Sequence, residues 1–297
     1  MKSGKILRAM TRDGSARAIV ADTTGIAERA RRLHGLSLMS TIVLGRALTG
    51  ASMIGSLLSE KQESITLCIG GQGEAGKILV VSDYYGNVRG YLEEPQLPLK
   101  LTQDGRPDVA GAIGGGYLSL AHETGKGKPQ TGAVPLRSGE IAEDIAAYYA
   151  ESEQIPTVCS LGILPAEDGS VRAAGGVLVQ LLPFPNEETV SDLEKNAASF
   201  GHVTEMLAKG KSLTEIMQLV MGDLPFDLFD EITTDYLCTC SRERMLRGIR
   251  SLGDTQIREL LSEEEKAGNG RTLTAHCRFC ETDYRFYEAE LLTPSEN

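Results

Sequence analysis

The sequence predicts an α+β protein in three parts: a mixed α/β domain, a helical linker and a small C-terminal domain. Three observations support this prediction. Strand and helix patterns are interspersed up to residue 183. The composition then changes at Pro183-Phe184-Pro185, and all 6 phenylalanines lie at or beyond Phe184. Beyond residue 231, cysteines occur in two close pairs. We therefore place the parts at 1–183, 184–231 and 232–297.

The first part contains both helical and strand signals. A helical period over 26–33 ends at Gly35, the residue type favoured just past a helix end. The low-charge stretch 36–58 continues as a buried helix. Ser138 is expected to cap a further helix, whose apolar face is formed by Ile141, Ile145, Tyr148 and Tyr149. Strands are expected over 65–69, 78–81, 88–92, 157–164 and 171–182, with turns at Gly86-Asn87 and Asp168-Gly169.

The stretch 36–58 is also the candidate for a membrane span. Arg46 lies near its centre, and an arginine at mid-bilayer costs at least about 2.5 kcal/mol. At the N-terminus, Lys2, Lys5 and Arg8 are followed by polar residues, not by the apolar run of an export signal. We therefore expect no membrane association, a cytoplasmic location and cysteines that are reduced at rest.

The net charge of -11 is unevenly distributed. Residues 1–183 carry 18 Lys+Arg and 19 Asp+Glu, whereas residues 184–297 carry 12 and 22. A protein that binds nucleic acid needs a basic surface to neutralise phosphates, and one that docks on an anionic membrane needs the same. The charge therefore argues against both kinds of partner.

The predicted linker, 184–231, contains 3 basic and 10 acidic residues. Asn186 before two glutamates is typical of a capped helix start, and Ser212 with Glu215 forms a capping-box pattern for a helix that stops at Gly222. One interpretation is a pair of surface helices that cover the first domain. Another is a linker that is folded only conditionally, because acidic amphipathic helices are marginally stable alone. The two interpretations are compatible.

The cysteine pairs of the last part point to a metal site. Cys238 and Cys240 form a C-x-C pair, Cys277 and Cys280 form a C-x-x-C pair, and 36 residues lie between the two pairs. Four thiolates in two close pairs suit one tetrahedral zinc ion, and soft sulfur ligands select zinc over magnesium or calcium. His276 is an alternative ligand by its position. A site with four protein ligands has no open position, so its zinc is structural.

The C-x-C spacing also permits a strained, easily reduced disulfide. Structural zinc supplies about 10–16 kcal/mol of apparent folding free energy, whereas the core of a segment this small supplies about 3–5 kcal/mol. Disulfides that close such short loops would each contribute less than the ~3 kcal/mol of a 15-residue loop. Exchanging zinc for disulfides should therefore unfold the segment, which predicts a redox switch.

Other motifs predict no catalytic site, so we do not expect an enzyme. Cys68 and Cys159 lie in strand patterns and are expected to be buried as small apolar residues. No G-x-S-x-G motif is present, and residues 71–77 match a P-loop only until Ile78, where Ser or Thr would hold magnesium. The alternatives are a thiol–disulfide oxidoreductase that uses its C-x-x-C pair and a zinc ribbon that binds nucleic acid. The acidic charge disfavours the zinc ribbon.

Four segments and the cysteine pairs together resemble the 33-kilodalton chaperonin family of redox-regulated heat-shock chaperones. The resemblance extends over essentially the whole length. The segments are Gly86-Asn87-Val88-Arg89-Gly90-Tyr91, Ser138-Gly139-Glu140-Ile141-Ala142-Glu143-Asp144, Ser152-Glu153-Gln154 and Ala173-Ala174-Gly175-Gly176.

The resemblance implies a bacterial holdase, a chaperone that binds unfolding proteins without ATP under oxidative stress. It implies that the reduced protein holds one zinc ion per chain through Cys238, Cys240, Cys277 and Cys280 and is inactive. Oxidants, aided by heat, would form the disulfides Cys238–Cys240 and Cys277–Cys280 and release the zinc. The C-terminal domain and the linker would then unfold and expose apolar surface to clients, with formation of a homodimer through the first domain.

Overall fold

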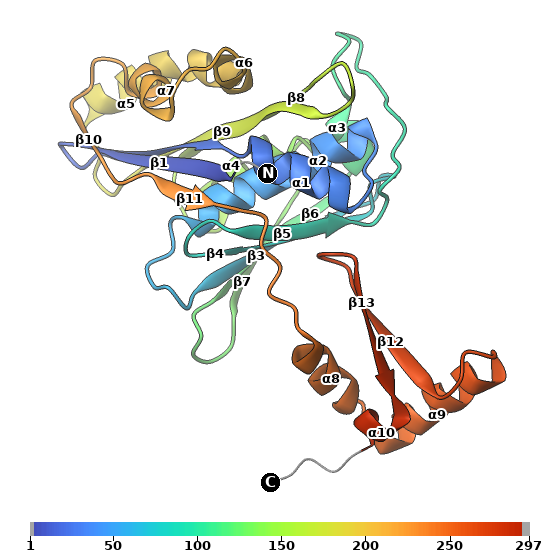
Figure 1. Cartoon of the computed structure of the whole chain (residues 1–297). Coiled ribbons are helices and arrows are strands. Elements are labelled where there is room, and N and C mark those ends of the chain that lie inside the picture. The colour runs from blue at the N-terminus through green and yellow to red at the C-terminus, as the bar shows by residue number, and fades with distance from the viewer. Residues whose placement is uncertain (1–2, 293–297) are drawn as a thin grey trace. The chain divides into compact units, whose positions relative to one another are not determined.

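The computed structural model describes residues 3–292 and divides the chain into two compact units, with the boundary between Leu237 and Cys238 (Figure 1). The predicted linker segment 184–231 lies within the first unit. The architecture is mixed α and β, as predicted, because both units contain helices and antiparallel sheets.

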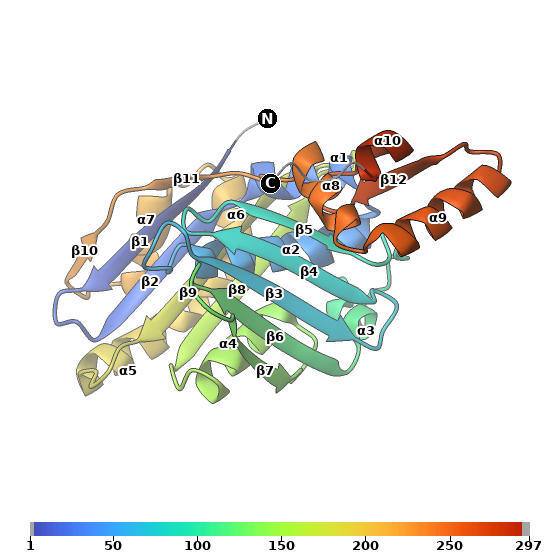
Figure 2. The same cartoon turned by 90° about the horizontal axis from the view of Figure 1, so that it is seen from below.

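The first unit contains two antiparallel sheets, and Figure 2 shows the five-stranded sheet face-on. The strands of the six-stranded sheet, in the order β10-β1-β2-β9-β8 with β11 also paired to β1, are β10 (Phe226–Leu228), β1 (Gly4–Thr11), β2 (Ala16–Asp22), β9 (Val171–Leu181), β8 (Thr157–Pro165) and β11 (Ile232–Thr234). Those of the five-stranded sheet, in order, are β5 (Val88–Leu92), β4 (Lys77–Asp83), β3 (Ser64–Gly71), β6 (Gly116–Glu123) and β7 (Gln130–Pro135).

Helices separate the two sheets and cover the outer face of the six-stranded one (Figure 1). Those nearer the interior are α1 (Thr24–Leu33), α2 (Leu38–Gly55), α3 (Val109–Ile113) and α4 (Ile141–Glu151). Those on the outer face are α5 (Glu187–Asn196), the 3-10 helix η1 (Ala197–His202), α6 (Val203–Ala208) and α7 (Leu213–Met221). The first unit is therefore layered as helix, sheet, helix and sheet.

The main apolar core surrounds α2, between the two sheets. The composition and length of α2 would allow it to span a membrane, but 89% of it is buried inside the protein. Its Arg46 forms an ion pair with Glu140, and its glycines permit close packing, since a Cβ at Gly50 would lie 2.5 Å from the Ile145 Cδ1 atom. The helix is thus the central core element of the first unit.

The predicted helix signals are confirmed in most places. Gly35 has a φ of 58° just beyond α1, and Asn186 caps α5 by accepting a hydrogen bond from the Glu188 amide. Ser212 and Glu215 form the capping box of α7. The prediction that Ser138 caps the fourth helix is wrong. Glu140 occupies the N-cap position of α4. The buried Asp144 in the first turn accepts hydrogen bonds from the Arg137 and Ser138 amides.

A second core lies under α5, η1, α6 and α7, the helices of the predicted linker, which are called the linker helices below. Apolar residues of β1, β2 and β9 on the outer face of the six-stranded sheet pack against Leu193, Phe200, Ile216, Met217 and Val220. The Met217 side chain has an exposed fraction of 0%, whereas Leu219 on the same helix is 43% exposed. The linker helices therefore cover an apolar sheet face that would otherwise be in contact with water.

A short strap, residues 226–237, leads from the linker helices to the second unit. Its strands β10 and β11 both pair with β1. Its Tyr236 is 1% exposed, and the hydroxyl donates to the Gly90 carbonyl oxygen at 2.8 Å and contacts His34 Nε2 at 2.9 Å. The chain is thus anchored in the first unit two residues before Cys238.

The second unit is small. Its helices and strands are α8 (Arg242–Arg250), α9 (Asp254–Lys266), β12 (Thr272–Cys277), β13 (Thr282–Tyr287) and α10 (Glu288–Leu291). The sequence predicts helices around 242–249 and 255–265, a break at Gly268-Asn269-Gly270 and a hairpin of 271–276 with 282–287, and the structure contains all of these. The core consists of five buried apolar side chains, namely Ile257, Leu261, Leu273, Phe286 and Leu291.

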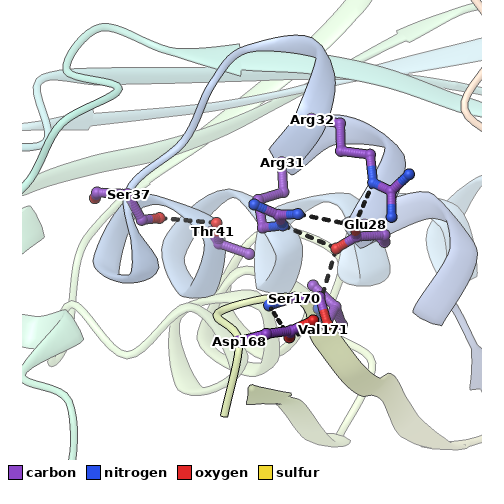
Figure 3. Close-up of polar contacts among 8 residues, drawn as sticks. All are labelled: Glu28, Arg31, Arg32, Ser37, Thr41, Asp168, Ser170 and Val171. Atoms are coloured by element: carbon purple, nitrogen blue, oxygen red, sulfur yellow. Dashed lines mark hydrogen bonds and ion pairs between the residues drawn. The ribbon is translucent and has the colours of Figure 1, made fainter. Parts of the chain in front are cut away.

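One carboxylate ties α1 to the β8–β9 hairpin (Figure 3). Glu28 accepts hydrogen bonds from Arg31 and Arg32 and from the Val171 amide at 3.0 Å, and its side chain is 13% exposed. The hydrogen bond from Arg31 is the main cause that lowers the pKa of Glu28 to about 2, from 4.5. Because the pKa of Glu28 is lower in the folded than in the unfolded chain, its ionised carboxylate stabilises the fold above about pH 4.5. This stabilisation is lost as the pH falls toward 2.

We expect Glu28→Gln to lower the free energy of unfolding at pH 7 by on the order of 2–3 kcal/mol. The difference in the free energy of unfolding between Glu28→Gln and the unsubstituted protein should become smaller as the pH falls below about 4.5. Urea unfolding followed by circular dichroism at pH 7, 5 and 4 measures it, with the exposed Glu167→Gln as the control. A difference that did not change with pH would contradict the assigned role of the carboxylate.

Candidate metal centre

The candidate centre is built from the loop before α8 and the turn between β12 and β13. Cys238 and Cys240 lie in the segment that precedes α8, while Cys277 ends β12 and Cys280 lies in the turn to β13. The Cys280 and Glu281 amides donate to the Cys277 carbonyl oxygen at 3.1 and 2.8 Å, which closes this turn. Residues far apart in the sequence are thereby brought to one point.

All four predicted sulfur atoms meet there. The Sγ atoms of Cys238, Cys240, Cys277 and Cys280 lie within 4.8 Å of one another. Two of the sulfur–sulfur contacts run between the pairs, 3.7 Å from Cys238 to Cys277 and 3.3 Å from Cys240 to Cys280. A tetrahedron with metal–sulfur bonds of ~2.3 Å has edges of about 3.8 Å, so the sulfur atoms fit the zinc site predicted from the sequence.

The electrostatics of the cluster also favour a cation. Burial raises the pKa of the Cys238 and Cys277 thiols. Burial acts in the same direction on Cys280, but hydrogen bonds with Thr282 and the neighbouring thiols outweigh it and lower its pKa to about 7. Four thiolates so close together repel one another, so full deprotonation requires a bound cation. With four soft donors, zinc is the ion that this set suits best.

The alternative ligand His276 does not join the sulfur atoms. Its Nδ1 lies 2.7 Å from an Asp283 carboxylate oxygen, and its Nε2 lies 2.9 Å from one of Glu281. Both ring nitrogens are thus engaged by carboxylates, and hydrogen bonding to Asp283 is the main cause that raises the pKa of His276. The metal-ligand candidates that the structure brings together are the four cysteines.

Two side chains that were not predicted as part of the site contact the sulfur atoms. The Tyr284 hydroxyl lies 3.2 Å from Cys240 Sγ, and the Thr282 hydroxyl lies 3.3 Å from Cys280 Sγ. The sequence pattern of β13 could have indicated them, because alternate residues of a strand share a face, and Thr282 and Tyr284 therefore lie on the same face as the buried Phe286. These side chains connect the cluster to the small core.

The remaining cysteines lie in the first unit. Cys68 is 9% exposed on β3, and Cys159 on β8 is half-buried. Burial raises the pKa of Cys159 to about 12, so this thiol is protonated at neutral pH and is a poor nucleophile. The P-loop-like segment 71–77, which the sequence predicts to be a hairpin loop, forms the connection between β3 and β4 instead of opening a helix.

Known proteins match this chain over nearly its whole length. A family model described as "Hsp33 protein" matches residues 4–287. A protein of Acetivibrio thermocellus named 33 kDa chaperonin is 41% identical over 287 residues, which cover 97% of this chain and 95% of that protein. One of Clostridioides difficile with the same name is 38% identical, with 97% of each chain covered. The crystal structure of a 33 kDa chaperonin from Thermotoga maritima matches with a TM-score of 0.86 at 33% identity, covering 98% of this chain and 97% of the other.

Proposed function

This chain belongs to the Hsp33 protein family, and from its chaperone function we propose that it is a redox-regulated holdase that binds unfolding proteins without ATP. The observation that carries the proposal is the cluster of four sulfur atoms within 4.8 Å, placed in a unit with a core of five apolar side chains. A unit so small depends on its metal for folding, which makes the oxidation state of the sulfur atoms a control on structure.

In the reduced state, Cys238, Cys240, Cys277 and Cys280 hold one zinc ion per chain as thiolates. The ion supplies folding free energy and no catalytic step, because four protein ligands fill its coordination shell. Side chains beyond the sulfur atoms add to this folded state. Arg242 lies over the Phe286 ring at 4.5 Å and pairs with Glu290 at 2.6 Å.

On oxidation, two thiolates in each pair give up two electrons to one peroxide molecule. With two protons taken up, the peroxide becomes two waters, and a sulfur–sulfur bond forms. In line with the family resemblance, the proposed pairings are Cys238–Cys240 and Cys277–Cys280. These short loops stabilise the fold by less than the ~3 kcal/mol of a 15-residue loop, whereas the zinc site contributes about 10–16 kcal/mol. The second unit is then left without enough stabilisation to remain folded.

Client binding is assigned to the face under the linker helices. In this proposal residues 1–183 bind clients and form the homodimer, 184–231 are the conditional linker and 232–297 are the redox switch. Loss of the second unit would loosen the linker and uncover the apolar face of β1, β2 and β9. Residues 184–237 carry 11 acidic and 3 basic side chains, and such a charge helps an unfolded segment to remain soluble.

The proposal includes no ATP site, enzyme activity, nucleic acid or membrane partner, and it places the protein in the cytoplasm. An oxidoreductase would instead turn over a disulfide substrate, whereas a switch oxidises only itself. Reduction of an added protein disulfide by the reduced form, monitored over many equivalents, separates these functions. Turnover beyond two disulfides per chain would contradict the holdase proposal.

The direct test follows the light scattering of a chemically unfolded client diluted into this protein. One sample is reduced and zinc-loaded, the other is treated with peroxide at mild heat, and released zinc is read in the same tube. We expect only the oxidised sample to suppress aggregation, with about one zinc released per chain. Retained zinc, or equal behaviour of both samples, would overturn the proposal.

A further inference from the structure

Two half-buried arginines lie side by side on the inner face of the six-stranded sheet. In the β1–β2 register, Arg8 is opposite Ile19 and Met10 is opposite Arg17, so the two arginines are diagonal neighbours. They share the face of Ile6 and Ile19, which belong to the main core, while the adjacent Leu7 and Ala9 point to the linker helices. The pair is thus on the face that the linker does not cover.

These guanidinium groups are poorly satisfied. Each arginine has five N–H donors. Within residues 3–292, Arg8 donates one hydrogen bond, from Nη1 to the Ser56 carbonyl oxygen at 2.7 Å, and its buried Nε has no acceptor. Arg17 donates one, from Nε to Gln180 Oε1 at 2.8 Å. Among residues 3–292, neither Arg8 nor Arg17 forms an ion pair with a carboxylate, and burial lowers the pKa of Arg17. An anion that accepted hydrogen bonds from both side chains would satisfy the buried Nε of Arg8 and offset the repulsion between the two like charges.

The two side chains line a cavity of about 220 Å³, together with Met10, Leu57 and Phe229. The Arg8 guanidinium lies 5.9 Å from the centroid of the Phe229 ring, which is 45% exposed. A guanidinium presents its donors in a planar fork that matches the oxygens of a phosphate or a carboxylate. The unused donors, the missing counter-charge and the cavity therefore indicate the same class of ligand, an oxyanion.

A larger cavity of about 360 Å³ adjoins the first, since Arg17 and Leu57 line both. Its wall includes the rings of Tyr148 and Tyr149, and its volume lies within the range of small-molecule sites. His122 on this wall has a buried Nε2 that lies 3.6 Å from a Glu63 carboxylate oxygen and makes no hydrogen bond. The wall also carries the Glu153 carboxylate, which accepts a hydrogen bond from the Tyr148 hydroxyl at 2.9 Å. The cavity thus offers apolar ring surface next to the arginine pair.

We propose that Arg8 and Arg17 bind the phosphate or carboxylate group of a small organic molecule, whose apolar body occupies the adjoining cavity lined by Tyr148 and Tyr149. The site lies apart from the four sulfur atoms in the sequence and on the opposite face of the sheet from the proposed client surface. Its ligand would stabilise the first unit by mass action, whatever the redox state of the cysteines.

The test uses the full-length, reduced, zinc-loaded protein and three probes: inorganic phosphate, phenyl phosphate and benzoate. Calorimetric titration and the unfolding temperature are measured at constant ionic strength, with chloride as the reference anion. We expect phenyl phosphate or benzoate to bind more tightly than inorganic phosphate and to raise the unfolding temperature above the chloride value. Arg17→Gln and Arg8→Gln should each weaken binding by about 10-fold or more, because hydrogen bonds to charged groups are lost.

The matched control is Arg106→Gln, a surface arginine that is 77% exposed and pairs with Asp104. It should bind the probes as the unsubstituted protein does. Binding no stronger than that of chloride would overturn the site, as would unchanged binding in both Arg8→Gln and Arg17→Gln. If inorganic phosphate bound as tightly as phenyl phosphate and benzoate, the assignment of the adjoining cavity would be wrong. Because no client or oxidant is present, these outcomes do not depend on the proposed holdase function.

Discussion

Replacing Cys277 by serine is expected to remove tight zinc binding and to unfold the second unit even under reducing conditions. Cys277 is 3% exposed, the most buried of the four cysteines, and it closes the turn between β12 and β13. Loss of a direct ligand should weaken zinc binding by more than the 10–100-fold that is typical of an outer-shell partner. Competition with a chromophoric chelator measures the affinity, and limited proteolysis reports the folding of residues 238–292.

The matched control is Cys68→Ser, in the first unit. It removes a buried thiol of the same size but should leave the zinc stoichiometry and the protease resistance of the second unit unchanged. A Cys277→Ser protein with native zinc stoichiometry and unaltered protease resistance would contradict the assignment of this ligand.

Met217→Asp is expected to give a chaperone that is active without oxidation. The Met217 side chain is fully buried between α7 and the six-stranded sheet. An unpaired carboxylate in this position costs several kcal/mol, which is more than the packing of one short helix can offset. The helix should detach and expose apolar surface, while the sulfur cluster, in the other unit, retains its zinc. Binding of a hydrophobic dye and client light scattering, both under reducing conditions, measure the effect.

Leu219→Asp provides the control on the same helix, because Leu219 is 43% exposed and a charge there remains solvated. It should bind neither the dye nor the client when reduced. A Met217→Asp protein that binds the dye but does not protect the client would show that clients bind elsewhere.

The helices of this fold were the easiest elements to predict, because capping is local. Asn186 and the Ser212–Glu215 capping box lie within a few residues of the turns that they fix. Some strands with one buried face were predicted from their apolar residues, as in β4, but β6 and β7 were missed. The strands β1 and β2 were missed. The linker helices cover one face of these strands and the main core covers the other. Because both faces are buried, apolar and polar residues do not alternate along the sequence. The strands that cover the outer edge of β1 come from residues 226–234, more than 200 positions later.

The candidate metal centre was likewise predicted only where its features are local in the sequence. The spacing of Cys238, Cys240, Cys277 and Cys280 predicts the donor set, because each pair is local. It does not predict the sulfur contacts between the pairs, 3.7 Å from Cys238 to Cys277 and 3.3 Å from Cys240 to Cys280, since these depend on how the loop before α8 meets the β12–β13 turn. Nor does it reveal the pairing of Arg8 with Arg17, which depends on the register of two strands that the sequence analysis did not identify.

The central claim is that oxidation of the sulfur cluster uncovers the sheet face beneath the linker helices. Hydrogen exchange followed by mass spectrometry, on the same protein before and after peroxide treatment, tests it most directly. We predict that the amides of α5, α6, α7 and residues 238–292 lose protection on oxidation, while those of β2, β9 and the five-stranded sheet keep it. An oxidised, client-binding protein whose α5–α7 amides remained as protected as in the reduced form would contradict the account.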